Sequence, residues 1–268
     1  MTQIEAPLSN GDIMKSSERV EVTPRDRLLL EQAHTDLLTV ESAHCHHFAG
    51  QNVGAVHSTL RRLYGKPPKY GLLRPYPLDS RRKYYRLTQR GARMLGVSRH
   101  HTRPLNQQGK VQRYTLSWLM HIDSQGERTH FSPRDHPDKF HLLENRFPHH
   151  PFFIEERDGA VRLGCVIVDH NALPQNAARK TVQALQRFLL HGWFDVYIKA
   201  GLFSVHLTTF DEQRRRTLRR LLALMIRDRL NVPLARLGTD VQLDVQVRHV
   251  PGMKQLLDSD SNSPVSHK

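Results

Sequence analysis

Apolar positions in the first part of the chain recur at helical spacing in two successive segments. The first helix is expected to start with Thr23 as its N-cap and Pro24 at the first helical position, residues that favour a helix start. Its apolar stripe continues to Leu38. A second helix is predicted over Val40–Phe48, with Gly50 as its stop signal. Two short helices in series therefore precede the segment that carries the candidate chemistry.

A third helix is predicted to open at Gln51-Asn52 and to run to about Tyr64. Its buried face would consist of Val53, Val56, Leu60, Leu63 and Tyr64. The opposite face would carry Gly54, Ser58, Arg61 and Arg62, with His57 flanking it. This helix is amphipathic, and its polar face is basic.

Two short strands and a closing helix follow. The strands are predicted at Gly71–Tyr76 and Lys83–Leu87, and Pro77–Arg82 forms the hairpin tip between them. The closing helix would run from Thr88, its N-cap, to Leu95. Three helices followed by a basic hairpin is the order of a winged-helix DNA-binding domain. In such a domain the third helix enters the major groove and the hairpin lies against the phosphates.

The charge of this region agrees with a nucleic-acid partner. The whole chain carries a formal charge of +14 and has a pI of about 10.2. From Gln51 to His100 there are twelve Lys and Arg residues, and Asp79 is the only acidic one. We expect base contacts from Asn52, Ser58, Arg61 and Arg62, with Gln51 and His57 at the edges of the site, and phosphate contacts from Arg74, Arg81, Arg82 and Lys83.

The second half has a different pattern. A helix is favoured over Val111–Ile122, and short strands between loops are expected over Asp123–His150. Strands are then predicted at Phe152–Glu155, Val161–Val168, Phe203–Thr209 and Val241–Val250, with helices at Pro174–Leu190 and Asp211–Leu230. This alternation predicts a three-layer α/β arrangement. The chain as a whole is therefore expected to be α+β.

The expected domain organisation has five parts. A disordered lead covers 1–22, the winged helix 23–98, a linker 99–110, the α/β domain 111–257, and a disordered tail 258–268. Two cysteines, Cys45 and Cys165, form no disulfide framework, and the N-terminus lacks the apolar core of a signal peptide. No apolar run approaches the ~18 residues that span a bilayer. These features favour a cytoplasmic protein with no membrane partner.

Two clusters have competing interpretations. The run His44-Cys45-His46-His47 contains metal-ligand residue types, but only His44 and His47 would share a helix face, so exposed histidines are favoured over a zinc site. The predicted helix Asp211–Leu230 is rich in arginine. It is interpreted either as a solvated amphipathic helix, with Leu218, Leu221, Leu222, Met225 and Ile226 buried, or as a second DNA contact.

Several motifs in order resemble the replication-relaxation family of plasmid and mobile-element proteins. In the first half they are Arg25-Asp26-Arg27, Leu60-Arg61-Arg62-Leu63-Tyr64 and Tyr85-Arg86-Leu87-Thr88-Gln89-Arg90-Gly91-Ala92. In the second half they are Val166-Ile167-Val168-Asp169-His170-Asn171, Lys180, and Val205-His206-Leu207-Thr208-Thr209 before the arginine-rich helix. The resemblance spans roughly Thr23 to Leu230. It implies a C-terminal half similar to the PD-(D/E)xK nuclease fold.

The chain departs from that nuclease pattern where metal ligands are needed. Two carboxylates would hold Mg²⁺ while a lysine supports the attacking water. In the alignment that the resemblance gives, the first acidic position falls on His149, and Ile167 replaces the carboxylate two residues before Asp169. Asp169, Glu155 and Lys180 remain as the catalytic set if the domain is active. We therefore expect no catalysis and no cofactor, with Mg²⁺ required only in the nuclease alternative.

The sequence thus predicts a sequence-specific, double-stranded DNA-binding protein. The resemblance implies a role in replication, mobilisation or transcriptional control of a mobile element, with a second copy of the chain and replication or conjugation proteins as further candidate partners. Two rival classes stay open: a Mg²⁺-dependent endonuclease, and an adaptor whose winged helix contacts a protein in place of DNA.

Overall fold

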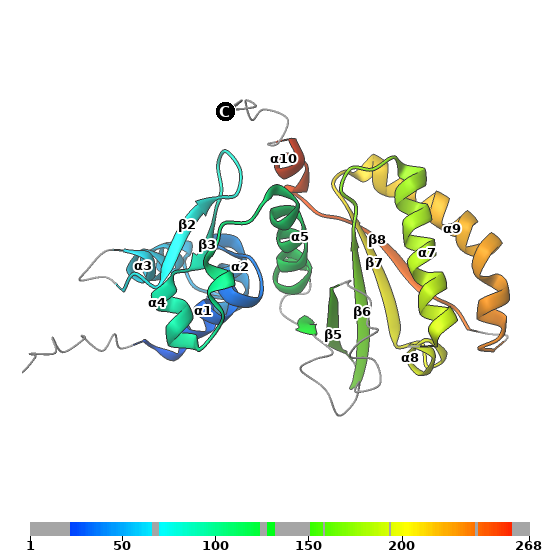
Figure 1. Cartoon of the computed structure of the whole chain (residues 1–268), viewed down its shortest axis with the longest axis horizontal. Helices are drawn as coiled ribbons and strands as arrows, with labels where there is room; N and C mark the ends of the chain where they lie inside the picture. Colours follow the sequence, from blue (N-terminus) through cyan, green and yellow to red (C-terminus); the bar gives the residue numbers. More distant parts are fainter. Residues whose placement is uncertain are drawn as a thin grey trace, which may run out of the picture.

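The computed structural model describes residues 22–65, 70–123, 128–131, 151–157, 159–192, 194–238 and 241–258. It is a mixed α+β structure with a three-stranded and a five-stranded sheet. We call residues 22–102 the N-terminal unit and residues 107–258 the C-terminal unit. Helix α5 (Gln107–Ser117) lies between the small sheet and the large one (Figure 1).

The N-terminal unit contains four helices and a small antiparallel sheet. The helices are α1 (Pro24–Thr35), α2 (Val40–His47), α3 (Val53–Tyr64) and α4 (Gln89–Leu95), and the strands are β1 (Leu38–Thr39), β2 (Leu73–Pro77) and β3 (Lys83–Leu87), in the order β1-β3-β2. The predicted helices, and the two strands that flank the hairpin tip, are thereby confirmed within a few residues.

Polar caps explain where these helices begin. The Thr23 hydroxyl accepts from the backbone N–H of Asp26 at 3.2 Å, and the Asp26 carboxylate accepts from the N–H of Thr23 at 3.1 Å. This reciprocal capping box satisfies two of the free N–H groups at the start of α1. The side chains of Asn52 and Thr88 each cap their helix, α3 and α4, by accepting one hydrogen bond from a backbone N–H of the first turn. The predicted N-caps Thr23 and Thr88 are thereby confirmed.

The end of the first helix differs from the prediction. Helix α1 stops at Thr35, so Leu37 and Leu38 lie outside it. Asp36 takes an extended conformation, and Leu38 pairs with Tyr85 across β1 and β3. The apolar spacing continued past the helix end because Leu37, just before β1, and Leu38, in β1, are also fully buried.

The segment between the units is more helical than the predicted linker 99–110. A 3-10 turn, η1, covers Arg99–Thr102, and α5 starts inside that range because the Asn106 side chain caps it. Helix α5 continues directly into a π-helical segment, η2 (Trp118–Asp123), which confirms the helix expected over this region.

The C-terminal unit is built on a sheet of order β4-β5-β6-β7-β8. Its elements are β4 (Arg128–Phe131), β5 (Phe152–Arg157), β6 (Ala160–Val168), α7 (Pro174–His191), α8 (Asp195–Lys199), β7 (Phe203–Thr209), α9 (Glu212–Ala235), β8 (Asp244–His249) and α10 (Met253–Asp258). Strands β4 to β6 are antiparallel, and β6, β7 and β8 are parallel. The right-handed crossovers from β6 to β7 and from β7 to β8 advance in the same direction across the sheet. They therefore place α7 and α9 on the same face of it (Figure 1).

The two faces of the large sheet have different partners. Leu163 and Cys165 of β6 point toward α7 and α9 and belong to the largest apolar cluster. Val166 of β6 and Phe153 of β5 point the other way, toward α5 and η2. Gly164 lies beside Phe153, and a Cβ atom built there would come within 2.0 Å of its ring, so only glycine fits. The rest of this second face carries polar side chains.

The short helix α10, which the sequence did not predict, connects the two units. After β8 the chain crosses back to α5 (Figure 1). One apolar cluster there contains Leu37, Leu78, Tyr84, Val111, Tyr114, Val250, Met253 and Leu256. The hairpin, α5 and α10 therefore share one core. Among the described residues, no helix combines the length and the apolar character needed to cross a bilayer.

Candidate nucleic-acid interface

Helix α3 presents the polar face that the sequence predicted. Val56, Leu60 and Leu63 are fully buried against the N-terminal core. Gly54, His57, Ser58 and Arg61 are exposed. These four positions follow the spacing i, i+3, i+4 and i+7, so they form one continuous stripe along the helix. Val53, which we predicted to be buried, is 42% exposed at the first turn.

Arg61 and Arg62 have different roles in the fold. The Arg62 guanidinium donates to both oxygens of the fully buried Asp26 carboxylate, at 2.6 and 2.8 Å. It thereby ties α3 to the capping box of α1. Arg61 makes no ion pair within the part of the chain that the structure describes, and its side chain is free to reach a partner.

The residues before α3 are also engaged locally. The side-chain Oδ1 of Asn52 accepts from the N–H of Gly54 at 2.8 Å, as a helix cap does. The Gln51 side chain accepts from Arg25 at 3.3 Å, and the Gln51 carbonyl accepts from the ring of His44 at 2.8 Å. Both Gln51 and Asn52 are exposed at the N-terminus of α3, where they remain available for an additional contact.

The hairpin places its cations on two different faces. Lys83 is exposed and lies two residues before Tyr85, so the two side chains point to the same face of the strand. The ring of Tyr85 stacks on Tyr64 of α3 at 5.9 Å. Lys83 therefore lies on the same side of the small sheet as α3. Arg74 is exposed on the other side, with its guanidinium 5.6 Å from the ring centre of Tyr76. Because Arg74 is on the opposite side of the small sheet, it does not share the surface formed by α3 and Lys83.

The hairpin tip separates Arg81 from Arg82. Arg81 is exposed and contributes only its backbone N–H, to Asp79 at 2.8 Å. Arg82 donates from Nε to Asp79 at 2.6 Å, from Nη1 to the hydroxyl of Tyr114 at 2.6 Å and from Nη2 to the carbonyl of Gly252 at 2.9 Å. Arg82 thus joins the hairpin to α5 and to the start of α10. Its guanidinium is occupied within the protein.

The charge of Asp79, the single acidic residue between Gln51 and His100, is neutralised by its neighbours. Partial burial favours the neutral form of Asp79, but the backbone N–H groups of Arg81 and Arg82 and the Arg82 guanidinium outweigh it and lower the pKa of the carboxyl. Asp79 therefore stays ionised and paired. Among the other cations, Arg86 is only 3% exposed, and Lys66 and Lys69 lie outside the described residues. The exposed cations from α3 to η1 are Arg61, Arg74, Arg81, Lys83, Arg90, Arg93 and Arg99.

The residues of the nuclease alternative are not brought together. Asp169 is buried at the end of β6, where Arg214 of α9 holds both of its oxygens, at 2.5 and 3.0 Å, and the Thr209 hydroxyl donates at 3.2 Å. Glu155 pairs with Arg162 in the strand register, and Asp169 follows seven residues later along β6. At ~3.3 Å per residue this places the backbone of Asp169 about 23 Å along the strand direction from that of Glu155. Their separation prevents them from sharing one metal ion.

The other members of that alternative do not complete a site. Lys180 is exposed on α7, and no hydrogen bond or ion pair joins it to Asp169 in the part of the chain that the structure describes. Glu155 accepts from Arg128 of β4 at 2.9 Å, on the sheet face opposite α7. His149 lies outside the described residues. In the described ranges, no group of three or more His, Cys, Asp or Glu side chains is positioned to hold a metal ion.

The histidines of α2 have partners in both units. His47 contacts the side chain of Gln32 at 3.0 Å, and burial followed by the neighbouring His46, His121 and Arg25 charges lowers its pKa to about 4. His46 is exposed, and its ring centre lies 4.5 Å from that of His121. The prediction of exposed histidines is therefore wrong for His44 and His47, which are half-buried.

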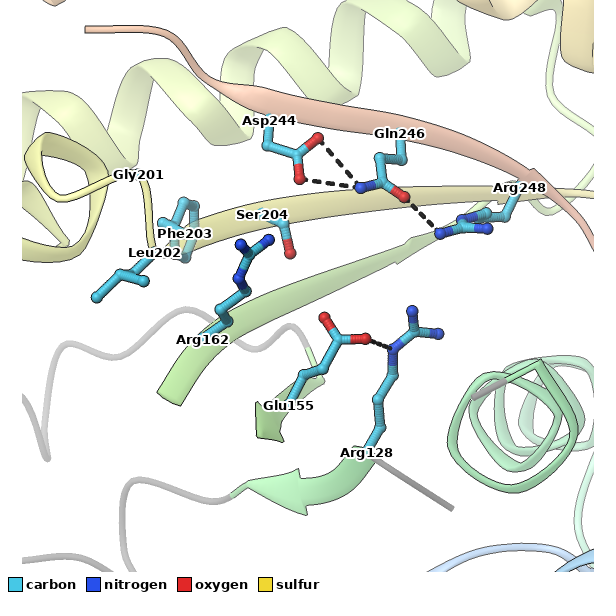
Figure 2. A pocket seen from close by; sticks show the side chains of 10 residues that line it. All are labelled: Arg128, Glu155, Arg162, Gly201, Leu202, Phe203, Ser204, Asp244, Gln246 and Arg248. Atoms are coloured by element: carbon cyan, nitrogen blue, oxygen red, sulfur yellow. Dashed lines mark hydrogen bonds and ion pairs between the residues drawn. The ribbon is translucent and has the colours of Figure 1, made fainter. Parts of the chain in front are cut away.

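A set of polar residues on the large sheet was not singled out from the sequence. Arg162, Ser204, Gln246 and Arg248 line a small cavity on the sheet face that α7 and α9 leave uncovered (Figure 2). The alternation of apolar and polar residues over Val241–Val250 was the available signal. This alternation indicated that the polar residues of the strand share one face. It could not indicate which side chains of the neighbouring strands lie beside them.

Comparison with known proteins adds no family assignment. No protein-family model matches the chain, and no curated protein shows significant similarity to it.

Proposed function

We propose that this chain is a sequence-specific, double-stranded DNA-binding protein and that its N-terminal unit acts as a winged helix. In this proposal α3 is the recognition helix that enters the major groove. The phosphates are contacted by the tip of the β2–β3 hairpin and by the side of the hairpin that carries Lys83. The observation that carries the proposal is the exposed stripe of α3. It combines small and neutral residues with Arg61 and has no acidic residue.

The surface chemistry supports this choice of partner. Gly54 and Ser58 are small, so a groove can approach the helix closely. His57 and Arg61 offer donors at its edge, and arginine pairing with guanine is the commonest specific base contact. Arg81 and Lys83 are the exposed cations on the hairpin that suit phosphate binding beside α3. Arg62 and Arg82 are better explained as structural, because their guanidinium groups already have protein acceptors.

The proposed biological role is in replication, mobilisation or transcriptional control of a plasmid or other mobile element, as the resemblance to the replication-relaxation family implies. We propose that the nuclease-like half acts without cleaving DNA. The pairing of Asp169 with Arg214, and its distance from Glu155, support this part of the proposal.

The test is binding of the full chain to duplexes from its own locus and to random duplexes, across a salt series. Arg61→Ala should weaken binding to the own-locus duplex by about 1–3 kcal/mol and reduce the preference for it. Lys83→Ala should weaken binding equally on all duplexes and reduce the salt slope by about 0.9. Arg187→Ala, an exposed cation on α7, is the charge-matched control and should change neither quantity.

Two outcomes would count against the proposal. Binding that is equal on every duplex and unaffected by Arg61→Ala would mean that only a basic surface is present. No binding to any duplex would favour the adaptor, in which the same face of α3 contacts a protein.

A further inference from the structure

The strongest unassigned feature is the small cavity on the uncovered face of the large sheet. It has a volume of about 50 Å³ and is lined by side chains from β4 to β8 (Figure 2). Because side chains alternate along a strand, Glu155, Arg162, Ser204 and Gln246 all point to the face opposite α7 and α9. The sheet therefore brings polar groups from separate strands to one place.

The acceptors that line this cavity already hold donors. Glu155 accepts from Arg128 at 2.9 Å. Both oxygens of Asp244 accept from the Gln246 amide, at 2.9 and 3.1 Å, and the Gln246 oxygen accepts from Arg248 at 2.6 Å. Figure 2 shows this chain of contacts along β8. The Glu155 carboxylate is thus paired with a guanidinium, whereas the Asp244 carboxylate is held by a neutral amide and keeps its negative charge in the cavity lining.

The donors are in excess. Arg162 makes no hydrogen bond or ion pair within the described part of the chain, although it is the cross-strand neighbour of Glu155. Its Nε and the Nε of Arg248 are buried without a partner there. Figure 2 shows Arg162 directed toward Ser204. Buried donors of this kind are normally matched by an acceptor.

Ser204, which lines the cavity, adds a third donor through its contact with His206. His206 is 1% exposed, and its Nε2 lies 3.2 Å from the Ser204 hydroxyl. Its Nδ1 has no partner among the described residues, so the tautomer with the proton on Nε2 avoids burying an unmatched N–H. In that tautomer the Ser204 oxygen accepts from His206. The Ser204 proton is then free to be donated into the cavity.

We propose that this cavity binds a small oxyanion, such as inorganic phosphate, sulfate or the terminal phosphate or carboxylate of a larger molecule. Arg162 supplies a planar pair of donors, Arg248 supplies its Nε–H, and Ser204 supplies its hydroxyl. The volume is on the scale of one such group. This site is separate from the surface of α3 and does not depend on DNA binding.

The experiment measures anion binding to the full chain by calorimetry and by thermal unfolding, at constant ionic strength. Inorganic phosphate, sulfate and acetate are the probes, and their relative affinities distinguish a tetrahedral anion from a carboxylate. We expect saturable binding with a rise in Tm, since a ligand that binds only the folded state stabilises it. Arg162→Gln should weaken binding by about tenfold or more, and Ser204→Ala by severalfold.

Two control variants separate this site from other basic surfaces. Arg187→Gln removes an exposed cation from α7 on the opposite face, and it should bind the anion as the unsubstituted chain does. Arg162→Lys keeps the charge but loses the paired donors, so it should bind more weakly while leaving the anion-free Tm unchanged. Absence of saturable binding, or equal loss in Arg162→Gln and Arg187→Gln, would overturn the proposal.

Discussion

The guanidinium of Arg82 donates to the phenolic oxygen of Tyr114 across 2.6 Å, and this contact fastens the β2–β3 hairpin to α5. The Tyr114 hydroxyl in turn donates to the carbonyl of Pro251 at 2.8 Å. A residue that the charge pattern assigned to phosphate binding is therefore part of a junction between the two units. The neighbouring Arg81 is the cation that the junction leaves exposed.

This difference between adjacent arginines gives the first prediction. Arg82→Ala should lower the free energy of unfolding by about 1–3 kcal/mol, because Asp79, Tyr114 and Gly252 each lose a donor. Arg81→Ala should change it by less than about 0.5 kcal/mol, as exposed substitutions do. Urea unfolding of the two variants provides the measurement. Equal stability of both would show that the junction contributes nothing.

The second prediction concerns the pair that joins α3 to α1. Asp26 is fully buried and Arg62 is 41% exposed, so the pair is stronger than a surface ion pair but partly screened. A double-mutant cycle with Asp26→Asn and Arg62→Ala should give a coupling energy of about 1–2 kcal/mol. A coupling near zero, measured by the same denaturant titration, would mean that Arg62 is available to DNA after all.

The third prediction concerns Asp169 and Arg214 at the end of β6. Arg214→Ala leaves the fully buried carboxylate without its bidentate partner and should cost about 3–5 kcal/mol. Arg216→Ala is the control on the same helix: its side chain is 79% exposed, and the variant should stay within about 0.5 kcal/mol of the unsubstituted chain. If Arg214→Ala is as stable as Arg216→Ala, Asp169 is not held as we describe.

The fourth prediction is a pH dependence centred on His206. Burial, and then the charges of Arg128 and Arg248, lower the pKa of His206 to about 3. The unfolded chain, with a histidine pKa near 6.5, then binds a proton more readily than the folded chain. Stability from this group is complete above pH about 6.5 and is lost progressively as the pH falls toward 3, by about 1.4 kcal/mol per pH unit.

His206→Gln provides the comparison, because it removes the titrating ring and keeps a polar side chain. Its free energy of unfolding should fall less steeply between pH 6.5 and 4 than that of the unsubstituted chain. His47, whose pKa is also lowered, contributes to the remaining slope in both proteins. Parallel pH profiles would rule out His206 as the dominant titrating group.

The outline of both units followed from local patterns. Helix caps at Thr23 and Thr88, the buried stripe of α3 and the strong apolar strand at Val161–Val168 are all set by residues close in sequence. The amphipathic stripe also identified the exposed residues of α3 in advance. Such features are predictable because periodicity and capping act within one or two turns.

Other features depended on distant partners. The strand at Leu38–Thr39 exists because β3 pairs with it. Helix α10 is short, and it is held by the apolar cluster that it shares with α5 and the hairpin. Neither has a strong local signal, because each is stabilised by residues far away in the chain.

The sequence by itself determined the basic charge, the order of the longer helices and strands, and the amphipathic face of α3. Only the tertiary structure decided which cations are free: it places Arg62 on Asp26 and Arg82 on Tyr114 and Gly252, and leaves Arg61 and Arg81 exposed. It also separated Glu155 from Asp169 and gathered Arg162, Ser204 and Arg248 around one cavity. The physical reason is that charge and periodicity are properties of the chain, whereas the partner of each charged group depends on which strands and helices pack together.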